Sequence, residues 1–316
     1  MSPRRRTGLA SAALVAVVAC FGVRAASAGS PGERAATVLA EKVAPAIVHV
    51  RLVISAKASM QGQEFAMPEQ EGDVAGVVVD PSGLVLAGSP MHLVRSIEAQ
   101  MPGLSISMGL HRPRVRLSGD ATEHEAVLVA QDASLGLAYF QVVTPPATPL
   151  AAVDLGVGTT GAVGDDLYGA RRLDREFDDA FAVQRTRVAG FLEQPRRMGI
   201  LRGDFNEHGM PVFRADGTPA GVYALQMGAV DAMEHGGRPD MLGGLLPLDV
   251  VRASLAQAKK RVPDALAKAK EATPEAAAPA KPADGTPAPA KPAPDQPAPE
   301  TPAPETPKAP VVPGME

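Results

Sequence analysis

Short runs rich in Val, Leu and Ile, separated by turn signals, fill the middle of this 316-residue chain and constrain its fold more than any other feature. Asp80-Pro81-Ser82-Gly83 has Pro and Gly where a tight hairpin needs them, and Asp216-Gly217 is a second hairpin signal. Many short antiparallel strands closed by a C-terminal helix predict an all-β body of barrels rather than alternating βαβ units. The expected strands are 47–54, 74–79, 84–86, 114–117, 126–129, 137–143, 183–192, 212–214 and 220–225, with a closing segment at 243–247.

Two helices are expected to flank this body. Residues 33–43 show apolar side chains at helical spacing and stop before Pro45, and a second helix starts at Leu248. Pro263 is expected to end the second helix near Lys260, because proline removes a helical hydrogen bond.

The composition excludes some classes of protein. A formal charge of -4 and a pI near 5.9 leave no broad basic surface, so nucleic acid is not an expected partner. Only 3% of the residues are aromatic and Trp is absent, so the core is expected to consist mainly of Val, Leu, Ala and Met. With a single cysteine, no intramolecular disulfide is available to the fold.

Both ends of the chain differ from this body. Residues 1–28 combine a basic start, an apolar run and the small-residue site Ala26-Ser27-Ala28, which is typical of a signal peptide and predicts export to the periplasm or cell envelope. Cys20 ends a segment that resembles a lipobox, so a lipid anchor at Cys20 is the alternative to cleavage after Ala28 and the one membrane attachment expected. Residues 262–316 form an Ala/Pro-rich tail that is expected to be a disordered spacer.

Five segments, in this order, resemble the HtrA-type (high-temperature-requirement) trypsin-like serine proteases. They are residues 36–50, 76–86, 127–143, 210–222 and 243–251. The resemblance covers residues 33–258 and implies a trypsin-like double β-barrel, with six-stranded antiparallel barrels at about 45–145 and 150–247 and a substrate cleft between them. It does not extend to a PDZ domain, because the Pro-rich tail stands where one would follow.

The residues that such a protease needs for catalysis are replaced. The resemblance places the His position of the family's triad at Pro90, the Asp position at Gly136 and the Ser position at His208. An imidazole cannot take the role of the acyl-forming hydroxyl in that mechanism. No Ser or Cys lies between Ser134 and Ser254 to act as a displaced nucleophile, so no catalytic residue is expected.

The sequence therefore favours a non-catalytic pseudoprotease that binds a peptide or protein in the inter-barrel cleft, or a scaffold protein of the cell envelope. An enzyme is the alternative: a serine-type endopeptidase of the HtrA-like family with an altered active site, or a hydrolase that uses His92, Asp132 and His208 in a new arrangement. His92 reaches the His position only with a two-residue insertion, and Asp132 fits a turn residue.

Other charged groups give weaker signals. Glu207-His208 and Glu234-His235 lack the spacing of metal ligands, so neither a metal nor another cofactor is predicted. A mixed-charge, solvated loop is expected at residues 165–179, which contain Asp165, Asp166, Arg171, Arg172, Asp174, Arg175, Asp178 and Asp179.

Overall fold

The computed structural model describes residues 30–89, 103–194, 196–203, 207–227 and 241–272, together with Val94, Ile97, Glu98, Met101 and Phe205. The first six strands are β1 (Ile47–Met60), β2 (Gln63–Asp80), β3 (Leu84–Gly88), β4 (Leu104–Arg116), β5 (Glu123–Asp132) and β6 (Leu137–Val142). The next six are β7 (Asp166–Arg172), β8 (Phe181–Leu192), β9 (Met198–Arg202), β10 (Pro211–Phe213), β11 (Pro219–Met227) and β12 (Met241–Leu246). The helical elements are α1 (Pro31–Lys42), η1 (Ala44–Ala46), η2 (Arg175–Phe177) and α4 (Leu248–Ala272).

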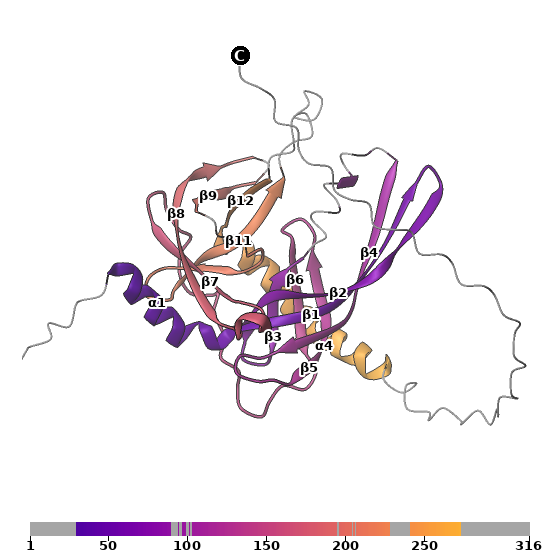
Figure 1. Cartoon of the computed structure of the whole chain (residues 1–316), viewed down its shortest axis with the longest axis horizontal. Helices are drawn as coiled ribbons and strands as arrows, with labels where there is room; N and C mark the ends of the chain where they lie inside the picture. Colours follow the sequence, from indigo (N-terminus) through magenta and orange to yellow (C-terminus); the bar gives the residue numbers. More distant parts are fainter. Residues whose placement is uncertain are drawn as a thin grey trace, which may run out of the picture. The chain divides into compact units, whose positions relative to one another are not determined.

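The strands close into two six-stranded antiparallel barrels with the same strand order (Figure 1). In the first barrel the order is β1-β2-β3-β6-β5-β4, and in the second it is β7-β8-β9-β12-β11-β10. Each strand is hydrogen-bonded to two neighbours, so closure leaves no open sheet edge within a barrel. The predicted trypsin-like double β-barrel fold is confirmed.

The predicted hairpin turns form where the sequence places them. At the β2–β3 turn, the Gly83 N–H donates to the Asp80 carbonyl at 2.9 Å and Gly83 has a φ of 94°. At the β10–β11 turn, Gly217 has a φ of 85°. Both φ values lie in the left-handed region that glycine enters without strain, so these residues fix the register of the strands on either side.

Helix α1 begins with a capping box, in which Ser30 and Glu33 satisfy each other's backbone N–H groups, and it ends as predicted before Pro45. Helix α4 packs on β5 and β6 of the first barrel and on β11 of the second, so it spans both barrels. Its buried apolar side chains recur every three or four residues. They are Leu248, Val251, Leu255 and Ala258.

The predicted end of the last helix is wrong. Helix α4 passes through Pro263 and continues to Ala272, so its last turns occupy residues that the sequence assigns to the tail. Pro263 is exposed, so water can solvate the carbonyl that loses its partner, and the strong helix formers Ala265 and Leu266 follow directly.

The first barrel carries an extension that the sequence did not predict. Strand β1 continues to Met60, pairs with β2 from Gln63 and with β4 from Leu104, and so adds a three-stranded sheet beyond the barrel (Figure 1). Pairing of β2 with β3 begins only at Gly76, and pairing of β4 with β5 only at Arg114. We call residues 54–60, 63–70 and 104–110 the arm.

Several predicted features lie outside the described residues: the signal peptide with Cys20, most of the Pro-rich tail, Pro90, His92 and Glu234-His235. Among the helices that the structure describes, none combines the length and the apolar character that a membrane span requires.

Candidate functional site between the barrels

The structure brings together three chain segments to which the sequence resemblance assigned the triad positions. Gly88 ends β3, and a Cβ atom placed on it would lie 2.8 Å from the Cδ2 ring atom of His208. The next residue, Ser89, donates its backbone N–H to the carbonyl of Gly136 at 2.7 Å. His208 and Gly136 therefore both lie against the end of β3, directly before the position of Pro90.

Glycine backbones close this contact. Gly209 has a φ of 82°, and any side chain on it would overlap the backbone of Gly88. The Gly209 N–H donates to the Tyr223 carbonyl at 2.8 Å, which holds the turn before β10 in place. We call Gly88, Gly136, His208 and Gly209 the glycine seam, because the end of β3 and the two loops that contain Gly136 and His208 meet there in close backbone contacts.

The His208 ring takes part in this packing. Its Nδ1 atom accepts the backbone N–H of Leu225 at 3.2 Å, so Nδ1 carries no proton and the ring is the neutral Nε2–H tautomer. The hydrogen bond from Leu225 on β11 fixes the orientation of the His208 imidazole. The described side chain at position 208 is thus an imidazole and not the hydroxyl or thiol that nucleophilic acyl transfer uses.

Asp132 serves the fold, because its described hydrogen bonds join it to the β5–β6 turn and to α4. One carboxylate oxygen accepts the backbone N–H groups of Ser134 and Leu135, each at 3.1 Å, as an Asx turn does. The other oxygen accepts the hydroxyl of Ser254 on α4 at 3.1 Å. Burial alone would raise the pKa of Asp132, but the hydrogen bonds from Ser134, Leu135 and Ser254 outweigh it and lower the pKa below its usual value.

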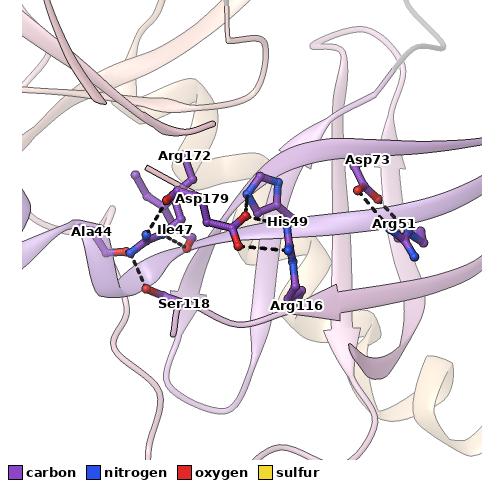
Figure 2. Close-up of polar contacts among 9 residues, drawn as sticks. All are labelled: Ala44, Ile47, His49, Arg51, Asp73, Arg116, Ser118, Arg172 and Asp179. Carbon is purple, nitrogen blue, oxygen red and sulfur yellow. Dashed lines mark hydrogen bonds and ion pairs between the residues drawn. The ribbon is translucent and has the colours of Figure 1, made fainter. Parts of the chain in front are cut away.

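A second contact between the barrels consists of charged side chains (Figure 2). Arg116 on β4 donates two hydrogen bonds to the Asp179 carboxylate, at 2.8 and 3.1 Å, in a bidentate pair. Asp178 and Asp179 have φ values of 56° and 51°, which are unusual for residues other than glycine. Arg116 thus holds the loop between β7 and β8 against the first barrel.

Arg172, at the end of β7, completes this contact (Figure 2). Its guanidinium donates to the carbonyls of Ala44 at 3.0 Å and Ile47 at 3.3 Å, and also to the Ser118 hydroxyl. A further bond reaches the Asp179 carbonyl at 3.1 Å. We call His49, Arg116, Arg172 and Asp179 the ion-pair seam.

His49 differs from its charged neighbours because one of its ring nitrogens has no hydrogen-bond partner among the described residues. The residue is 7% exposed, and its Nε2 atom lies 3.4 Å from Asp179 but forms no hydrogen bond with any described residue. Burial, followed by the charge of Arg116, lowers the pKa of His49 below its usual 6.5 although Asp179 opposes this, so the ring is neutral at neutral pH. A buried polar atom in this condition can be satisfied by an ordered water or by a ligand.

Two cavities adjoin the ion-pair seam and share His49 and Arg172. The larger has a volume of about 720 Å³ and extends along residues 116–121 and past Arg175, Asp178 and Asp179. The smaller, of about 330 Å³, reaches Glu207, which precedes His208. We call the two cavities together the inter-barrel groove. It runs from the ion-pair seam toward the glycine seam, and its size is in the range of ligand sites.

The expectation of a solvated loop at residues 165–179 is wrong for much of its length. Residues 166–172 form β7, and Arg172 and Asp179 connect the barrels. The sequence reasoning also missed His49 and Arg116. A charged or imidazole side chain within a Val-rich strand was the available signal, because such groups are buried only when they have partners.

Among the described residues, no group of three His, Cys, Asp or Glu side chains could hold a metal ion. No protein-family model matches the chain, and no curated protein matches it significantly.

Proposed function

We propose that this chain is an exported, catalytically inactive homologue of the HtrA-type trypsin-like proteases, which acts as a peptide- or protein-binding or scaffold module in the cell envelope. One observation carries the proposal: Gly88, Gly136 and His208 meet where the resemblance puts a triad, and the side chain at position 208, which the resemblance gives to the nucleophile, is an imidazole that accepts the Leu225 N–H. Acyl transfer needs an activated nucleophile at that point.

The inter-barrel groove supports the binding part of this proposal. The His49 Nε2 atom is a buried polar group that a ligand can satisfy, and the groove walls present arginine and aspartate side chains to the polar backbone of a peptide. Rigid strands β1, β4 and β7 carry His49, Arg116 and Arg172, so the site is organised before a ligand arrives.

Unfolded casein is a mixture of extended segments, so it can test both the loss of catalysis and the binding of a peptide. We expect the purified chain to leave casein intact and to bind fluorescently labelled casein saturably in an anisotropy titration. His49→Phe removes the Nε2 atom and should weaken binding at least fivefold. His111→Phe, an exposed change on β4 next to the arm, should leave it unchanged.

Casein cleavage that withstands repeated purification would contradict the loss of catalysis. Binding that His49→Phe does not weaken would contradict the groove as its site.

A further inference from the structure

The smaller cavity of the inter-barrel groove has an acidic lining. Its charged side chains are three carboxylates and two guanidinium groups: Asp73, Asp174, Glu207, Arg171 and Arg172. Both guanidinium groups are already bonded, because Arg171 donates to Glu207 and Arg172 donates to backbone carbonyls of the ion-pair seam. Three negative charges against two positive ones leave the lining with one excess negative charge.

Asp174 is the carboxylate that a ligand can pair with. It stands at the N-cap position of η2, yet its side chain makes no capping hydrogen bond, and it forms no ion pair with any described residue. The other two carboxylates are engaged: Asp73 is bonded to Arg51 (Figure 2), and Glu207 is bonded to Arg171. The unpaired charge of this cavity is therefore negative and lies at its exposed rim.

An aromatic side chain belongs to the same rim. Phe177, at the other end of η2 from Asp174, also lines the smaller cavity and is 61% exposed. The face of an aromatic ring attracts a cation, and the ring also packs against the methylene stem that carries the charge of Lys or Arg. A carboxylate beside an exposed ring thus suits a cation on a hydrocarbon stem.

His49 gives an independent observation. Its Nε2 atom is buried and has no hydrogen bond to any described residue, and in the Nδ1–H tautomer this atom accepts an N–H group. Burial lowers the pKa of the ring most and Arg116 adds to this, whereas Asp179, Asp73 and Asp174 oppose it. Three of the four charges named here are negative, so an acceptor atom lies in a field that favours a cationic donor.

From these observations we propose that the smaller cavity binds a basic side chain, Lys or Arg, of the peptide that occupies the groove. The proposal rests on the proposed function and adds the class of residue that the groove recognises. Asp174 supplies the opposite charge, Phe177 covers the stem, and His49 Nε2 accepts a hydrogen bond. A volume of about 330 Å³ is at the lower end of the range of ligand sites and suits one long side chain.

The larger cavity shows no such preference. Its lining has equal numbers of arginines and aspartates: Arg116, Arg172, Arg175, Asp120, Asp178 and Asp179. We expect it to contact the polar backbone of the peptide, whereas the smaller cavity selects by charge. An acidic side chain in the smaller cavity would meet like charge, which complementary sites avoid.

Short peptides that differ at one residue test this preference. Each has blocked termini and a fluorophore, and its central residue is Lys, Arg, Gln or Glu between Ala and Gly, so no other residue is charged. In anisotropy titrations with the full chain, we expect the Lys and Arg peptides to bind about tenfold more tightly than the Gln peptide. The Glu peptide should bind most weakly, and added salt should reduce the difference.

Two isosteric variants locate the site. Asp174→Asn removes the charge and should reduce the preference for Lys over Gln about fivefold. Asp178→Asn is the matched control, because Asp178 is exposed in the same loop but lines only the larger cavity, and it should leave the preference unchanged. Asp174→Lys should make the Glu peptide bind more tightly than the Lys peptide, a result that loss of folding cannot produce.

Equal affinities of the wild-type chain for the Lys and Gln peptides would overturn the proposal, as would equal effects of Asp174→Asn and Asp178→Asn. The proposed function fails separately. If labelled casein binds and His49→Phe weakens its binding, but the peptides show no preference, only the basic side chain is excluded. If the Lys preference appears but the chain cleaves casein, the loss of catalysis is contradicted and this proposal stands.

Discussion

The two seams between the barrels are closed in different ways. In the glycine seam, Gly88 and Gly209 bring backbones into contact and His208 is held by the Leu225 N–H. In the ion-pair seam, long charged side chains bridge the barrels and leave cavities beside them. The ion-pair seam therefore has space beside it and a buried polar atom, His49 Nε2, without a hydrogen bond among the described residues, whereas the glycine seam is closed by backbone contacts.

Substitution in the glycine seam should have the largest effect. Gly209→Ala introduces a side chain at a φ of 82° that overlaps the Gly88 backbone. We expect the free energy of unfolding to fall by about 3 kcal/mol or more in urea denaturation. Gly217→Ala is the matched control, because its φ is 85° but its nearest neighbour is a flexible Lys42 side chain at 3.5 Å.

Gly217→Ala should lower the free energy of unfolding by about 1 kcal/mol, because only the strain of a side chain at a positive φ contributes. Equal losses in the two variants would mean that the backbones do not meet at the glycine seam.

Breaking the ion-pair seam should cost less. Arg116→Met leaves Asp179 without its bidentate partner, and because the Asp179 side chain is 39% exposed, water compensates part of the loss. We expect Arg116→Met to lower the free energy of unfolding by about 2 kcal/mol in urea denaturation. Arg51→Met, which breaks the more exposed pair with Asp73, should cost about 0.5 kcal/mol. A smaller loss for Arg116→Met than for Arg51→Met would contradict the role of Arg116 as a tie between the barrels.

Substitution of Asp132 tests whether this residue stabilises the fold or acts together with His208. In a double-mutant cycle, Asp132→Ala and Ser254→Ala should show a coupling free energy of about 1 kcal/mol, because their side chains share a hydrogen bond. Asp132→Ala with His208→Ala should be additive. Coupling in the second cycle and none in the first would favour the alternative in which Asp132 acts with His208.

The smallest effect concerns pH. The pKa of His49 is lower in the folded chain than the 6.5 of an ordinary histidine, so the unfolded chain takes up a proton first as the pH falls. The stability that neutral His49 contributes is therefore present above pH 6.5 and is lost as the pH falls toward the folded pKa. Unfolding free energies measured on both sides of pH 6.5 should differ less in His49→Gln than in the wild type. An identical difference would show that His49 is not buried.

The fold could be predicted from the sequence because local signals agreed with the final structure. The turns at Asp80–Gly83 and Asp216–Gly217 set strand register, and the capping residues of α1 lie directly before its apolar positions. The arm could not be predicted in this way. Residues 55–59 alternate Ser, Ala and Lys, which have little intrinsic preference for strands, so their pairing with β2 and β4 decides their structure.

The candidate site, too, could be predicted from the sequence only in part. His208 and Gly136 were found because recognisable segments flank them on both sides. Asp179 was not, because its role depends on Arg116, which lies 63 residues earlier in the chain. Contacts between distant charged residues leave no periodic pattern in the sequence.

The central claim is that the nucleophile position holds no activated hydroxyl, and covalent labelling tests it most directly. The wild-type chain and His208→Ser would each be treated with a fluorophosphonate, which reacts with an activated serine, and the mass of the intact protein would be followed over time. We expect no mass increase in either, because Gly136 supplies no carboxylate and the seam supplies no base to activate even the introduced serine. A single stoichiometric adduct on the wild-type chain, mapped to any residue of the second barrel, would contradict the account.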